Sequence, residues 1–172
     1  MGERGEQVAK EVADMVLKND DFPSIVTAIR QGRILFNNIR KFIVYQLSYH
    51  LSEILVIAAV SFSIFVLPLR PLQLLFLNLL TVVFPALALG IGKGRGRVMQ
   101  EKPKDPEEPI LPVRSWKMIS VYGAIIATYV TGAYFFSKYY MGISEEIGNN
   151  IAFFALAFTQ LVHVFDMRDG DE

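Results

Sequence analysis

The segment that decides the fold is LQLLFLNLLTVVFPALALG, residues 72–90, which contains no charged side chain. A helix needs about 20 mostly apolar residues to cross the hydrocarbon core of a bilayer, so this segment predicts a transmembrane helix. The same segment contains Asn78, Thr81 and the helix-breaking Pro85. Membrane helices carry polar groups and irregular backbone mainly where these face a protein interior or a cavity.

Three further segments are long and apolar enough to span a membrane, at residues 42–67, 116–136 and 147–165. With residues 72–91 they predict an all-α membrane protein with four transmembrane helices in two hairpins, joined by a polar loop over 92–115. The 17 basic and 17 acidic residues cancel, which gives no support to a nucleic-acid partner. The chain has no cysteine, which excludes disulfides and thiolate chemistry.

Basic residues lie mainly on one side of the predicted spans. Arg30, Arg33, Arg40 and Lys41 precede the first span, six more basic residues occupy the loop over 92–115, and the two hairpin turns hold few. Because Lys and Arg accumulate in cytoplasmic loops, we expect both termini, including the tail 167–172, to be cytoplasmic. The lipid bilayer is the expected environment, with the plasma membrane as the expected location.

Residues 23–41 predict a helix that continues into the first span. Apolar residues recur at helical spacing at Ile25, Ile29, Phe36 and Ile39, and Pro23 suits the first turn. A helix unbroken from 23 to 67 would be about 67 Å long, at 1.5 Å per residue. Since that is roughly twice the hydrocarbon thickness, its first half would form a cytoplasmic stalk. The alternative is a separate amphipathic helix on the membrane surface.

Glu53 is the most unusual polar residue within the spans, because a carboxylate at membrane depth is costly. It acts either as an ion ligand or proton carrier, or as a protonated carboxyl group bonded to a neighbouring helix. Hard cations need several oxygen ligands, and Asn78, Thr81 and Gln160 offer amide and hydroxyl oxygens. Pro85 either frees backbone carbonyls near Thr81 in an unwound helix or makes a simple kink. We expect no catalytic or cofactor-binding residues.

Four stretches of the chain resemble the C-terminal part of P-type cation-transporting ATPases of the calcium and sodium/potassium pump group. The resemblance implies that residues 1–22 end the phosphorylation domain and that 23–41 form the stalk of the fifth transmembrane helix. It makes 42–91 and 116–166 the hairpins of helices five to eight. The four stretches are residues 2–43, 72–90, 98–111 (VMQEKPKDPEEPIL) and 157–169 (AFTQLVHVFDMRD).

The resemblance also implies an ion site, with departures from the calcium-pump pattern. Glu53 matches the glutamate of the fifth helix, and Asn78 and Thr81 match ligands of the sixth. Val82 replaces an aspartate, and Gln160 stands where calcium pumps have a glutamate. Further departures are His50 in place of an asparagine and Val83 in place of a glycine. Fewer charged ligands weaken a divalent site, so a proton or monovalent cation fits better than calcium.

The motifs with which this family hydrolyses ATP, DKTGT, TGES and GDGxNDxP, do not occur in the sequence. We therefore expect a membrane-domain fragment that hydrolyses no ATP alone and transports cations only with catalytic parts supplied elsewhere. A second chain or a full-length pump would be the partner. The alternatives are a stand-alone structural or regulatory membrane protein derived from a pump, a passive ion or proton pathway around Glu53, and a gene remnant without transport activity.

Overall fold

The computed structural model describes residues 5–18, 21–64, 66–90, 92, 98–103 and 108–167 of the chain. Of the described residues 80% are helical, and these ranges contain no strand. This confirms the predicted all-α class. The helices are α1 (Gln7–Glu11), α2 (Phe22–Ile64), α3 (Pro71–Gly90), α4 (Val113–Phe135) and α5 (Glu145–Asp166), with the short helical turns η1 (Val98–Gln100) and η2 (Phe136–Tyr140).

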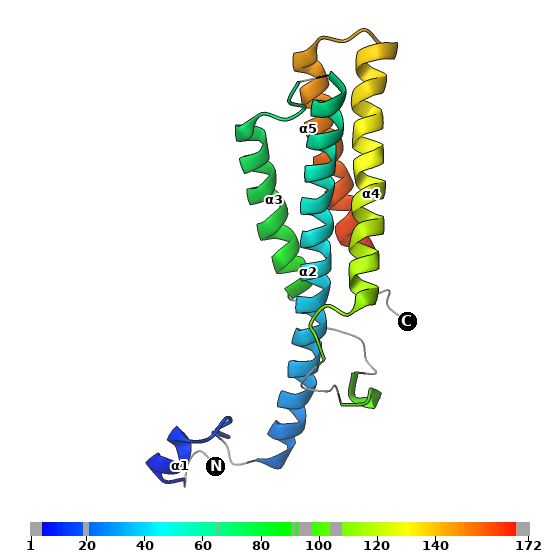
Figure 1. The fold of residues 1–172 in the computed structure, drawn as a ribbon. Coiled ribbons are helices and arrows are strands. Elements are labelled where there is room, and N and C mark those ends of the chain that lie inside the picture. Colours follow the sequence, from blue (N-terminus) through cyan, green and yellow to red (C-terminus); the bar gives the residue numbers. More distant parts are fainter. Residues whose placement is uncertain are drawn as a thin grey trace.

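Four helices, α2 to α5, are long and apolar enough to cross a membrane, as the sequence predicted. They run side by side, and the turns from α2 to α3 and from α4 to α5 lie at the same end, so the helices form two hairpins (Figure 1). We call this end the hairpin end and the opposite end the stalk end. The π-helical turn η2 continues α4 at the hairpin end, and Gly142 follows it with a φ of 61°.

Helix α2 is a single helix of 43 residues, which corresponds to a length of about 65 Å. Its first part extends beyond the other three long helices as a stalk (Figure 1). The alternative of a separate surface helix before the first span is therefore wrong. The helix is described to Ile64, short of the expected end at Leu67. Leu67 directly precedes Pro68, and the residue before a proline is disfavoured in helical conformation.

The bundle packs around α2, which lies against α4 most extensively and also contacts α3 and α5. The central core contains residues from all four long helices. Helix α3 contacts only α2 and α5 among the elements described, and most of its apolar side chains face outward. The buried core residues are Tyr49, Val56, Val60, Leu69, Leu77, Ile126, Ala127, Val130, Tyr134, Ala152 and Leu156.

The loop between α3 and α4 is bonded to the stalk part of α2. Arg33 donates through Nη1 to the carbonyl oxygens of Val98 at 3.0 Å and Glu101 at 2.8 Å. One turn further along, Asn38 Nδ2 donates to the carbonyl oxygen of Gly92 at 2.9 Å. These bonds satisfy loop carbonyls that no regular structure pairs, and they hold the loop beside the stalk.

Helix α3 remains helical through the segment that contains Pro85. The structure therefore favours the helical alternative over an unwound segment. Val83 gives a physical reason, because a β-branched residue lacks the backbone freedom of the glycine that the resemblance places at this position.

Candidate functional site

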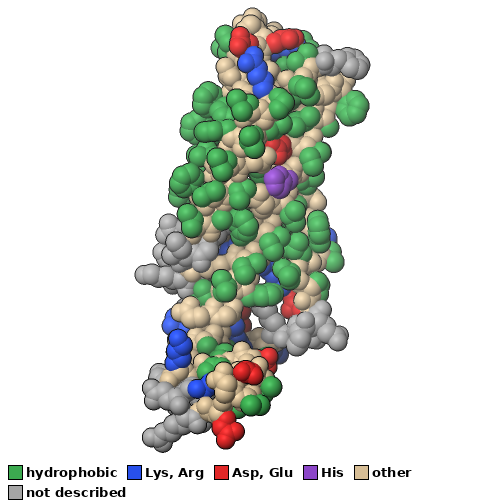
Figure 2. All heavy atoms as spheres, turned by 90° about the vertical axis from the view of Figure 1, so that its left-hand side faces the viewer, with side chains coloured by type: hydrophobic (Ala, Val, Ile, Leu, Met, Phe, Trp, Pro, Cys, Tyr) green, Lys and Arg blue, Asp and Glu red, His purple; other side chains and the backbone are tan. Residues whose placement is uncertain are grey.

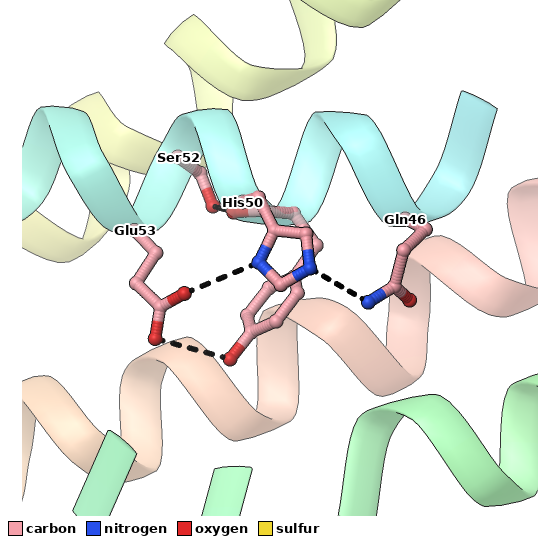
Figure 3. A network of polar contacts seen from close by, with 5 residues as sticks. Gln46, His50, Ser52 and Glu53 are labelled. Atoms are coloured by element: carbon pink, nitrogen blue, oxygen red, sulfur yellow. Dashed lines mark hydrogen bonds and ion pairs between the residues drawn. The ribbon is translucent and has the colours of Figure 1, made fainter. Parts of the chain in front are cut away.

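Glu53 lies on α2 and is 8% exposed. Its Oε1 accepts a hydrogen bond from the Tyr49 hydroxyl at 3.4 Å, and its Oε2 lies 3.4 Å from His50 Nδ1. His50 Nε2 in turn lies 2.8 Å from Gln46 Nε2 (Figure 3). Since the Gln46 amide nitrogen can only donate, this contact leaves the proton of a neutral imidazole on Nδ1, pointing at Glu53.

This network arises from the spacing of its members along one helix. Residues three and four apart share a helix face, so Gln46, Tyr49, His50 and Glu53 form a continuous polar strip on α2. The side chains point toward α3 and α5, whereas α4 lies on the other side of α2 (Figure 3). At 3.4 Å both contacts to Glu53 are longer than ordinary hydrogen bonds, so the carboxylate keeps acceptor capacity for another ligand.

The network opens to the surface on one side. The His50 side chain is 43% exposed, whereas that of Glu53 is 11% exposed. On the face drawn in Figure 2, a histidine and an acidic side chain show within the apolar band of the bundle. The other charged side chains on that face lie at the hairpin end and in the half of the molecule toward the stalk end (Figure 2).

Asn78 on α3 lies at about the same height as Glu53. The hydrogen bond from Asn38 to Gly92 shows that these two residues lie at one level of the antiparallel α2–α3 pair. Glu53 lies 15 residues after Asn38, and Asn78 lies 14 residues before Gly92, so Glu53 and Asn78 are level to within one residue. Asn78 Oδ1 is buried and has no hydrogen-bond partner among the described residues. It is therefore an oxygen ligand that is free to accept.

Thr81 lies in α3, one turn beyond Asn78, but its side chain lies outside the described part of the chain. Val82 follows it and is half-buried. Within the described ranges, no three His, Asp or Glu side chains gather as a metal-binding group. A cation here would depend on one carboxylate together with neutral oxygens.

Gln160 on α5 is fully buried, and both its amide oxygen and its amide nitrogen lack a partner among the residues described. The contact between the Tyr45 and His163 rings sets the register of the antiparallel helices α2 and α5. It places Gln160 opposite residue 48, five residues from Glu53, which is roughly 7.5 Å along the axis. Gln160 thus lies more than one turn nearer the stalk end than Glu53 and Asn78.

Two members of the polar strip, Gln46 and Tyr49, were not among the sequence candidates. Gln46 lies four residues before His50, and Tyr49 lies four residues before Glu53, so the sequence already indicated that they share a helix face. His163 was also not among the sequence candidates, and its Nε2 is buried without a partner in the described structure. Only the packing of three helices around this residue shows that.

The described part of the chain has four helices long and apolar enough to span a membrane, with the carboxylate of Glu53 buried among them. This defines the class as a multi-pass integral membrane protein with polar groups in its interior. Comparison of the sequence with protein families identifies the family. The family described as "Cation transporting ATPase, C-terminus" matches residues 66–172, and the chain belongs to it.

Relatives among characterised proteins agree with this assignment. A calcium-transporting ATPase of Bacillus subtilis is 39% identical over 98% of this chain and 19% of its own length. A calcium-transporting ATPase of Listeria monocytogenes is 36% identical over 96% of this chain and 18% of its own. A probable cation-transporting ATPase F of Mycobacterium tuberculosis is 40% identical over 64% of this chain and 12% of its own.

The chain spans about a fifth of the length of the first two relatives. It corresponds to the C-terminal membrane part of P-type ATPases, as the resemblance in the sequence indicated.

Proposed function

We propose that the chain forms the ion-binding half of a P-type cation pump membrane domain. It would transport cations only together with the catalytic parts that hydrolyse ATP. The observation that supports this best is the pairing of Glu53 with Asn78 at one height on α2 and α3. Glu53 holds only long contacts, and Asn78 Oδ1 has no partner in the described structure. Together they present unused oxygens inside the bundle.

We propose a proton or a monovalent cation as the transported ion. Calcium takes six to eight oxygen ligands, and its affinity rises with their charge. Val82 occupies the position at which the resemblance places a second carboxylate, so Glu53 carries the charge alone. Thr81 and Gln160 complete the proposed ligand set with neutral oxygens. The names of the relatives indicate calcium for those proteins, and the test below includes it.

The open side of the polar strip supports a partner segment. Polar groups at membrane depth usually face protein or a water-filled cavity, yet His50 is 43% exposed at its side chain. We infer that a further membrane segment covers Gln46 and His50 in the working pump. This segment would belong to the chain that carries the phosphorylated aspartate, whether a separate polypeptide or a full-length pump.

We place the stalk end in the cytoplasm, and the plasma membrane is the location we propose. Arg33 and Arg40 lie at the stalk end, where both bond the loop between α3 and α4. Arg70 and Lys138 lie at the hairpin end, where each pairs with a glutamate. The excess of basic residues at the stalk end agrees with the rule that cytoplasmic loops are positive.

The first experiment is purification of the tagged chain from native membranes in mild detergent, with identification of any stoichiometric partner by mass spectrometry. We expect a chain that contains DKTGT. The recovered complex is then tested for ATP-dependent uptake of protons, sodium, potassium and calcium in vesicles. Glu53→Gln should abolish uptake of the transported ion. Glu146→Gln is the matched control, because Glu146 lies at the hairpin end, exposed, in an ion pair with Arg70.

Recovery of the chain without a catalytic partner would refute the pump-fragment proposal. A second candidate function, a passive pathway, is favoured by the position of Glu53 beside the surface-exposed His50. It predicts ion or proton flux in vesicles that contain the purified chain alone, and loss of this flux in Glu53→Gln. If the complex takes up calcium, the pump proposal holds, but the proposal of a monovalent cation or proton as the transported ion is refuted.

A further inference from the structure

A second polar cluster lies between α2, α4 and α5, nearer the stalk end than Glu53. Its members are Gln160 and His163, which are three residues apart and therefore on the same face of α5. Gln160 is fully buried and His163 is 4% exposed. Three of their polar atoms, Gln160 Nε2, Gln160 Oε1 and His163 Nε2, have no partner among the described residues.

The position of His163 is fixed by aromatic rings from two other helices. The Tyr45 ring on α2 is stacked against it at a centroid distance of 5.5 Å, and the Tyr122 ring on α4 lies at 4.6 Å. The buried Met167, directly after α5, packs with Tyr45 and Tyr122 in a hydrophobic cluster. The imidazole therefore has little freedom to turn its Nε2 toward bulk water.

Other polar groups at this level are already bonded. The register of α2 and α5 places Gln160 opposite Ser48, whose hydroxyl is buried and donates to the Val44 carbonyl at 2.7 Å. Its oxygen can still accept a hydrogen bond. The cluster thus contains a donor in the Gln160 amide nitrogen and acceptors in its oxygen and in Ser48. His163 Nε2 either donates or accepts, depending on the tautomer.

Buried polar atoms in native proteins are almost always paired with protein or with ordered water. A buried water typically makes about three hydrogen bonds to groups that would otherwise be unsatisfied. The unpaired atoms of Gln160 and His163 match that number and include both donor and acceptor character. Adjacent side chains three residues apart leave their polar ends within reach of one shared water.

We propose that Gln160 and His163 hold an internal water between α2, α4 and α5. This water joins the polar ends of the two side chains and links them to the opposing face of α2. It makes the cluster a structural hydration site that fixes the three helices at the stalk end. The cluster lies more than one turn from Glu53 and Asn78 but shares Gln160 with the ligand set proposed above. The second test below observes the water without added cation, so failure of the ion-binding proposal would leave this proposal intact.

The first test is a double-mutant cycle on the full chain in lipid nanodiscs, read as the midpoint of thermal unfolding. Gln160→Leu and His163→Phe keep the approximate shape of each side chain and remove its polar atoms. If a water joins the two side chains, each single variant removes one hydrogen-bond partner of the water and leaves the other side chain incompletely bonded. Each single variant should then lower the midpoint by several degrees. The double variant should lower it by less than the sum of the two single changes.

A dry cluster predicts the opposite result. Replacing unpaired polar atoms by apolar groups of similar shape is neutral or stabilising, so both single variants would hold or raise the midpoint and would combine additively. That result overturns the proposal. Thr159→Val is the matched control on the same helix, because the Thr159 hydroxyl already donates to the Ala155 carbonyl at 2.6 Å. Its midpoint should change little.

The second test observes the water directly and does not depend on a variant folding. The wild-type chain is labelled with ¹⁵N in its glutamine side chains, and magnetisation transfer from water to these amides is measured by solid-state NMR in bilayers. We expect transfer to the Gln160 amide. Gln73, which is half-buried near the hairpin end and bonds Asn150 there, provides the positive control. Transfer to Gln73 without transfer to Gln160 refutes an internal water.

Discussion

Gly123 is where the structure makes its sharpest prediction about packing. It is buried on α4 and faces Leu51 of α2. A Cβ added there would lie 2.9 Å from Leu51 Cδ2, 3.0 Å from Cγ and 3.2 Å from Cβ. Rotation of the Leu51 side chain can move Cδ2 and Cγ but leaves Cβ in place, so the contact at 3.2 Å is relieved only if the two helices separate. We therefore predict that Gly123→Ala destabilises the bundle.

The magnitude follows from two opposing effects. Overpacking of a well-packed core costs about 1–3 kcal/mol, whereas replacing a helical glycine by alanine gains about 1 kcal/mol in helix propensity. Gly132 is the matched control on the same helix, because an added Cβ there meets nothing within 4 Å. Gly132→Ala therefore has only the favourable change in helix propensity. The unfolding free energies of the two variants should differ by about 1–3 kcal/mol.

The assay is thermal unfolding of both variants in the same detergent, followed by far-ultraviolet circular dichroism. For a chain of this size a change of 1 kcal/mol shifts Tm by about 2–4 °C. Gly123→Ala should melt below the wild type or near it, and Gly132→Ala slightly above it. Equal Tm values for the two alanine variants would refute the reasoning, because α2 and α4 would then separate at no cost.

Three further predictions concern single contacts. Arg33→Ala should speed hydrogen exchange in the loop residues 98–103 by about ten- to hundredfold, since a hydrogen bond to a charged group contributes about 1.5–3 kcal/mol. The matched change at the exposed Arg30, Arg30→Ala, should leave this exchange unchanged. Leu156→Ala should lower the unfolding free energy, measured by denaturant titration, by about 2–5 kcal/mol because it leaves a cavity in the core. Leu161→Ala, at a partly exposed site, is the control and should lower it only slightly. Tyr134→Phe should leave Tm unchanged or raise it, because the buried hydroxyl has no partner in the described structure; a clear fall in Tm would reveal a partner.

Much of the fold was predictable from local sequence. The four spans follow from runs of apolar residues, because backbone polar groups in a bilayer must be paired within helices. The stalk followed from the spacing of apolar residues at Ile25, Ile29, Phe36 and Ile39, and α2 is indeed one helix. The helical state of α3 around Pro85 did not follow, since a proline alone is compatible with a kink or with unwinding.

The candidate site was also predictable only in part. Glu53 was recognisable as a charge at membrane depth, and Gln46, Tyr49 and His50 share its helix face by spacing alone. The level of Asn78 beside Glu53 depends on the register of the α2–α3 hairpin, which turn length and packing determine.

The sequence by itself determined the number of spans, the polar residues within them and the family, because these depend on composition and on spacing along single helices. Only the tertiary structure decided which polar groups meet. It placed Gln160 more than one turn from the level of Glu53 and enclosed His163 between Tyr45 and Tyr122. The physical reason is that helix register, and close contacts such as Leu51 against Gly123, arise from side-chain packing between segments far apart in the chain.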